Sequence, residues 1–103
     1  MVENPEPKTL IILEGKDWFE FFFEGDNKYW RVRDHLDYPG WFIIEEYEDG
    51  WYRDESSDKY EHAGVSDLQG LYEALIRDPV RTLEGLLGEK FLIKEVKVEK
   101  VEE

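Results

Sequence analysis

The side chains able to do chemistry are crowded into one polar stretch. Five oxygen or imidazole donors fall within nine residues: Asp54, Glu55, Asp58, Glu61 and His62. A hard cation binds several oxygen ligands, and a histidine among carboxylates also suits a transition metal. The spacing is not that of an EF-hand loop, and charged runs are usually solvated. A metal-binding protein or small enzyme built on this stretch is therefore one alternative.

Other routes to catalysis find little support in the sequence. His35 lies between Asp34 and Asp37, a pattern that fits either an acid/base pair or a solvated loop histidine. The absence of cysteine excludes disulfides, thiolate chemistry and Cys-ligated zinc. No serine has a nucleophile-elbow context, and no glycine-rich phosphate loop is present. We assign no catalytic residue and no cofactor, and expect a non-catalytic protein.

The charge balance restricts the partners. The 103 residues include 26 Asp and Glu against 13 Lys and Arg, a formal net charge of −13. Direct nucleic-acid binding depends on Lys and Arg contacts, and anionic membranes attract basic segments, so neither partner is expected. A basic protein would be attracted, which also allows an acidic inhibitor or nucleic-acid mimic.

The sequence also predicts a cellular location and a thermophilic habitat. No basic region followed by an apolar run opens the sequence, and the longest apolar runs are four residues. A cytoplasmic protein is the default expectation. The richness in Glu and Lys, with one Gln, two Asn and one Met, is typical of thermophilic proteins.

The elements are expected to surround an aromatic strand at residues 17–24, which carries five aromatics in eight residues. Neighbouring strands are predicted at 9–14 and 29–33, then at 41–48 and 51–55 around the Asp49-Gly50 turn. Residues 56–64 are expected to form a loop.

Two helices and a last strand complete the prediction. Ser66 and Gln69 suggest a capping box for a helix ending before Pro79, and a second helix runs from Pro79 to Gly88. The last strand covers 89–101, with a bulge near Lys94 because its apolar phase changes there. It is free to return beside the first strand.

These elements predict one α+β domain at residues 9–101 behind a flexible arm at 1–8. An antiparallel sheet of five to six strands, a meander followed by two helices and a C-terminal strand, would carry both helices on one face.

Turn chemistry predicts the register of the first three strands. A two-residue II′ turn at Gly15-Lys16 would place Leu10 opposite Phe21, and the next turn would place Phe23 opposite Trp30. One face then holds only apolar residues: Leu10, Ile12, Phe19, Phe21, Phe23, Trp30 and Val32. The other face is mixed: Ile11, Leu13, Trp18, Glu20, Phe22, Glu24, Tyr29, Arg31 and Arg33. Glu24 would lie opposite Tyr29, and Glu20 opposite Arg33.

Aromatic residues outside the apolar face exceed what one small core needs. They are Trp18, Phe22, Tyr29, Trp41, Trp51 and Tyr52. An exposed aromatic patch rimmed by acids is typical of an interface, whereas a covered second face would make the same residues a core. We favour an interaction domain, with a homodimer through this face as one form and a basic protein as a possible second partner.

Overall fold

The fold is a six-stranded sheet with two helices. The computed structural model describes residues 6–38, 40–59, 65 and 67–101, and of residues 54–59 the backbone alone. The elements are β1 (Lys8–Glu14), β2 (Trp18–Phe23), β3 (Lys28–Asp34), β4 (Trp41–Glu48), β5 (Trp51–Lys59), α1 (Leu68–Arg77), α2 (Pro79–Leu87) and β6 (Ile93–Lys100). Neither helix of this described part is long and apolar enough to cross a membrane.

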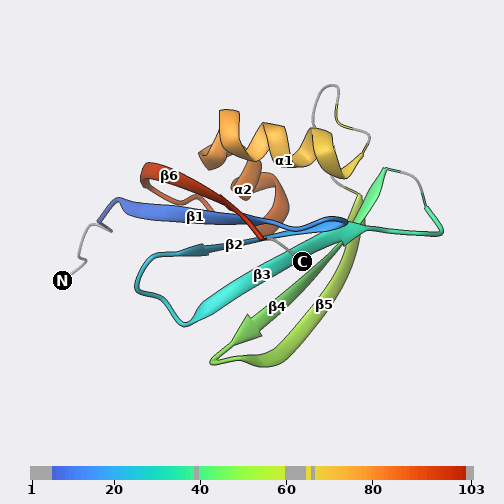
Figure 1. Ribbon diagram of the computed structural model, residues 1–103, viewed down its shortest axis with the longest axis horizontal. Coiled ribbons are helices and arrows are strands. Elements are labelled where there is room, and N and C mark those ends of the chain that lie inside the picture. The colour runs from blue at the N-terminus through green and yellow to red at the C-terminus, as the bar shows by residue number, and fades with distance from the viewer. Residues whose placement is uncertain (1–5, 39, 60–64, 66, 102–103) are drawn as a thin grey trace.

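The strand order is β5-β4-β3-β2-β1-β6. The first five strands form the predicted antiparallel meander. The helices then carry the chain from one edge of the sheet to the other, where β6 pairs with β1 in parallel (Figure 1). The α+β prediction is confirmed, with one parallel pair in an otherwise antiparallel sheet.

The apolar face of the sheet lies under the helices. All seven predicted apolar residues of β1, β2 and β3 are buried, and Phe42 and Ile44 of β4 extend the same face. The helices contribute Leu71, Tyr72, Leu75 and Leu83 to this cluster. Figure 1 shows both helices on one side of the sheet. The opposite face has no helix over it among the described residues and is called the open face below.

Two predicted registers are wrong by two residues. Leu10 pairs with Phe23 instead of Phe21, and Phe21 with Trp30. The turn is centred on Lys16-Asp17 and not on Gly15-Lys16, because Gly15 N–H donates to Trp18 C=O at 2.9 Å and so lies opposite Trp18; Gly15 also lacks the positive φ of a II′ turn. An even shift leaves every side chain on its predicted face.

The correction changes which charges meet across the strands. Glu20 lies opposite Arg31, not Arg33, and Tyr29 lies opposite Phe22, not Glu24. Tyr47 pairs with Tyr52 across the predicted Asp49-Gly50 turn, because Asp49 (φ 55°) and Gly50 (φ 81°) have the positive φ values of a type I′ turn.

The strand ends and helix caps differ in detail from the predictions. Asp67, not Ser66, is the α1 cap, and its carboxylate accepts from Gly70 N–H at 2.8 Å. The α2 limits are confirmed, with Pro79 at its start and Gly88 in the left-handed conformation at its end. β5 continues to Lys59, through part of the predicted loop. The β6 bulge is confirmed, because Lys8 pairs with Ile93 but Thr9 with Glu95.

Candidate functional site

The open face is organised in rows that cross the sheet. Backbone pairing places Ile11, Phe22, Tyr29, Tyr47 and Tyr52 side by side on five consecutive strands. We call Phe22, Tyr29, Tyr47 and Tyr52 the aromatic row. A second row, two residues along each strand, holds Leu13, Glu20, Arg31 and Glu45. An aromatic stripe therefore runs beside a charged one.

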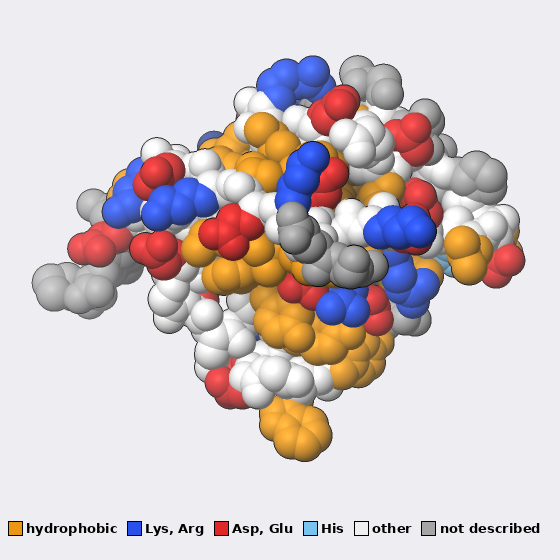
Figure 2. Space-filling model, in the orientation of Figure 1, with side chains coloured by type: hydrophobic (Ala, Val, Ile, Leu, Met, Phe, Trp, Pro, Cys, Tyr) orange, Lys and Arg blue, Asp and Glu red, His pale blue; other side chains and the backbone are white. Residues whose placement is uncertain are grey.

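The aromatic row is held by ring packing. The rings of Tyr29 and Tyr47 stack with centroids 4.8 Å apart and planes 2° apart. Tyr52 meets Tyr47 edge-on at 5.5 Å and is about half exposed. Figure 2 shows hydrophobic side chains gathered below the helices, with charged side chains among them. Rings that already pack on one another lose little freedom when a partner covers them.

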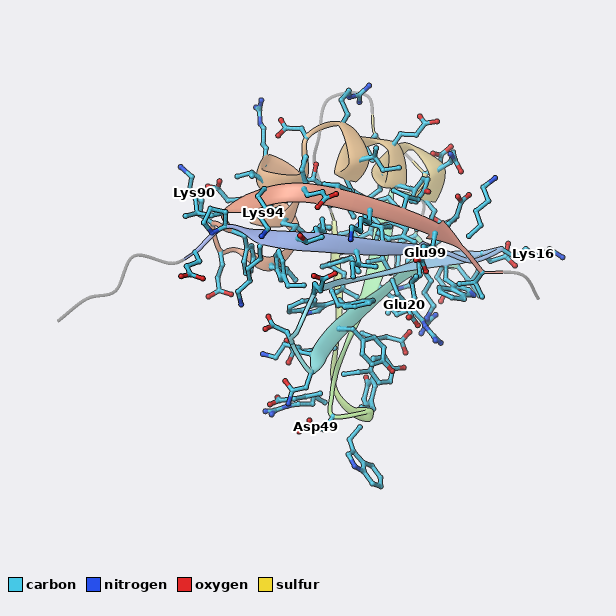
Figure 3. The ribbon with its side chains drawn as sticks, turned by 60° about the vertical axis from the view of Figure 1, so that its left-hand side comes forward. Lys16, Glu20, Asp49, Lys90, Lys94 and Glu99 are labelled. Carbon is cyan, nitrogen blue, oxygen red and sulfur yellow. The ribbon has the colours of Figure 1, made fainter. Side chains whose placement is uncertain are left out.

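Arg31 links the two rows. Its guanidinium is bonded to Glu20 through two nitrogens, at 2.6 and 2.9 Å, and stands 4.8 Å from the Trp18 ring centroid. Burial lowers the Arg31 pKa, but the Glu20 hydrogen bond and charge outweigh it and raise the pKa overall. Glu20 lies on the sheet side turned away from α1 and α2 (Figure 3). The arginine is therefore a fixed cation between aromatic rings.

Neighbouring charges on the open face are also paired. Arg33 Nε lies 3.3 Å from Glu45 Oε1. Burial, and then the negative charge of Glu45, raise the pKa of the Tyr47 hydroxyl. The second row and Arg33 together carry two arginines and two glutamates, so this part of an acidic protein is close to neutral.

Gly15 makes room for Trp18. A Cβ at Gly15 would lie 2.1 Å from a Trp18 ring atom, so only glycine allows the indole to rest on this turn. The glycine was predicted for its turn conformation, but its use here is close approach. The indole then presents its ring to Arg31.

The six predicted interface residues divide into two groups. Trp18, Phe22, Tyr29 and Tyr52 share the open face. Trp41 is on the same side of β4 as Tyr47 but at the far end of the strand, away from the aromatic row, with its ring centroid 6.2 Å from that of Tyr38. Trp51 is 79% exposed at the hairpin tip and, one residue before Tyr52, takes the other side of β5.

Sequence reasoning placed Glu20 and Arg31 on this face without naming them as interface residues, and it missed Glu45 and Tyr47. The alternation of Trp41, Ile43, Glu45 and Tyr47 in β4 was an available signal. The position of the β2–β3 turn, which decides the pairing of Glu20 with Arg31, was not.

The residues of the predicted metal-binding stretch fall at the limit of the described part or beyond it. Asp54, Glu55 and Asp58 lie in β5 with their side chains outside the described part, and Glu61 and His62 lie outside it entirely. No three His, Asp or Glu side chains in the described ranges are close enough to hold a metal ion. His35 Nδ1 accepts from Asp37 N–H at 3.2 Å, which uses that nitrogen within its own loop.

Acidic residues also meet below the β1–β2 turn. Glu14, Asp17 and Asp34 line a cavity of about 170 Å³ beside Trp18 and Tyr72. Burial, and then the charge of Asp67, raise the Asp34 pKa, although the Leu68 N–H lowers it in part. Burial and a hydrogen bond with Glu14 raise the Tyr72 pKa to about 12. Asp34 and Glu14, on the sheet, therefore hold the start of α1 in place through Leu68 and Tyr72.

Comparison with known proteins does not assign the chain to a family. No protein-family model matches the chain, and no curated protein or solved structure matches it either.

Proposed function

We propose that the protein is a non-catalytic interaction domain that forms a homodimer through the open face. The observation that supports this is the aromatic row beside the Glu20–Arg31 pair, on a sheet face with no helix over it among the described residues. Aromatic residues and arginine are the types enriched where protein interfaces bury most energy. The proposed interface comprises the aromatic row with Trp18 and Arg31.

The charges of the open face favour a second copy of the chain, over a basic protein, as the partner. The two glutamates beside the aromatic row are bonded to arginines and mostly buried, with exposed side-chain fractions of 13% for Glu20 and 15% for Glu45. A basic protein would meet paired acids and two arginines here. A second copy, turned by a two-fold axis, would bring an equally neutral surface.

The two alternatives predict opposite effects of salt. Two copies carry −13 each and repel at long range, so salt should strengthen the homodimer. Binding of a basic protein to an acidic one should weaken with salt.

The test is the molar mass in solution, by size-exclusion chromatography with light scattering across concentration and salt. We expect a dimer whose dissociation constant rises roughly thirtyfold or more in Tyr47→Ser, since loss of a central aromatic costs about 2 kcal/mol. Trp51→Ser is the matched control, because it removes a more exposed aromatic outside the row. A monomer at the highest soluble concentration, or a dimer lost in Trp51→Ser alone, would overturn the proposal.

A further inference from the structure

A second surface feature lies on the other side of the sheet. A cavity of about 370 Å³ opens between the β2–β3 turn and the connection from α2 to β6. Its volume falls in the range of small-molecule sites, roughly 300–1,000 Å³. Phe23 and Trp30, which line it, belong to the face under the helices, so the cavity is separate from the aromatic row.

Aromatic rings form one wall of this cavity. The Phe23 ring packs against Phe91 with centroids 5.1 Å apart. Trp30 is stacked on Phe21 at 5.3 Å and 19°, and its indole N–H donates to Glu46 at 3.1 Å. The rings are therefore fixed before any ligand arrives. A flat, apolar ring is the shape that packs best against such a wall.

Three lysines line the cavity from separate segments of the chain. Lys8 Nζ lies 3.1 Å from Asp26 and 5.9 Å from the Phe23 ring centroid. Lys28 Nζ lies 3.8 Å from Glu46 and 6.0 Å from the Trp30 ring centroid. Both cations are thus already paired with a carboxylate.

Lys90 differs from the other two lysines. Within the described residues, no carboxylate oxygen lies within 4.0 Å of its ammonium. It is exposed and precedes Phe91, whose ring is in the wall. Figure 3 shows Lys90 and Lys94 at the same end of the molecule. An anionic group bound to Lys90 would place an attached ring beside Phe91.

The other lining charges restrict the anion. Glu6, Asp26 and Glu89 balance the three lysines, so the lining has no excess positive charge to attract a polyanion such as a nucleotide. A single negative charge needs only one unpaired ammonium. We propose that this cavity binds a flat aromatic monocarboxylate, with its ring against the Phe23–Phe91 wall and its carboxylate on Lys90.

The test compares two probes of one shape. Naphthalene-2-carboxylate and the neutral naphthalene-2-carboxamide are titrated into the full chain by calorimetry. We expect the carboxylate to bind roughly fivefold or more tightly, and Lys90→Met to remove that preference, as one charge-assisted contact at an exposed site would do. Lys94→Met is the matched control, since Lys94 is an exposed neighbour outside the cavity lining.

Amide chemical shifts supply a readout that does not depend on a variant. With the carboxylate, the shifts should change at Phe23, the Trp30 indole N–H and Phe91, but not at Glu20 or Tyr52, which lie away from the cavity on the open face. Failure of both probes to bind at millimolar concentration would overturn the proposal, as would equal affinities or shift changes confined to the open face. None of these results depends on whether the protein dimerises.

Discussion

The two faces of the sheet are built from the same strands but differ in composition and in role. On the helix-covered face, the central inward positions of β1, Leu10 and Ile12, and all inward positions of β2 are apolar, and Phe21 is fully buried. On the open face, the alternate residues mix rings with paired charges, as Phe22 and Glu20 do. Burial under helices tolerates no unpaired charge, whereas a half-covered face keeps charges in contact with water. The difference separates residues that hold the fold from residues available to a partner.

Adjacent phenylalanines give the sharpest test of this contrast. Phe21→Ala should lower the free energy of unfolding by about 3–5 kcal/mol, because it empties part of a sealed core. Phe22→Ala, one residue away on the open face, should cost only about 1 kcal/mol. Urea unfolding measures both, and equal losses would mean that the faces are energetically alike.

The Trp18 support can be broken without changing the tryptophan. Gly15→Ala should cost about 1–3 kcal/mol, because the new Cβ displaces the indole from the turn and from Arg31. Thermal unfolding and tryptophan fluorescence would report this change. Lys16→Ala, in the same turn, should stay within about 0.5 kcal/mol and serves as the control. An unaltered Gly15→Ala protein would show that Trp18 does not rest there.

The Glu20–Arg31 pair should contribute less to the free energy of unfolding than the Phe21 ring or the Gly15 support of Trp18. A double-mutant cycle with Glu20→Gln and Arg31→Met should give a coupling energy toward the upper end of roughly 0.2–1 kcal/mol, because the pair uses two nitrogens and one partner is mostly buried. Urea unfolding of all four proteins measures it. A coupling energy of zero would remove the pair from the account of the open face.

The smallest effect is expected at Asp34. Its raised pKa means that the folded protein holds this proton more tightly than the unfolded chain does. The carboxyl therefore favours folding most below its unfolded-state pKa, and loses that contribution as pH rises through its folded-state pKa. Asp34→Asn should raise stability at pH 7 by less than about 0.5 kcal/mol, with no gain in strong acid. Unfolding measured across pH tests this, with Asp37→Asn as the control for net charge; a gain largest in acid would contradict it.

The sequence predicts sides of the sheet better than contacts across it. Alternation in β2 assigns Phe19, Phe21 and Phe23 to one face whatever the turn lengths, and both register errors were even. The identity of Arg31's partner depends on the β2–β3 turn beginning one residue earlier than predicted, which no residue pattern reveals. The α1 cap was displaced by one position because Ser66 and Asp67 are both good caps. The polar composition of residues 56–59 predicted a loop, so the full length of β5 was not expected.

The pairing of β1 with β6 has a consequence for how the chain folds. These strands are the first and last in sequence, so the sheet edge is complete only after residue 100 has been synthesised. The helices that cover the Phe19–Phe23 side also follow the whole meander in the sequence, so this apolar face is made before its cover. Contacts between such distant segments slow folding. We therefore expect the domain to close late and cooperatively, once β6 has been synthesised, and the emerging chain to rely on its repelling negative charges against aggregation.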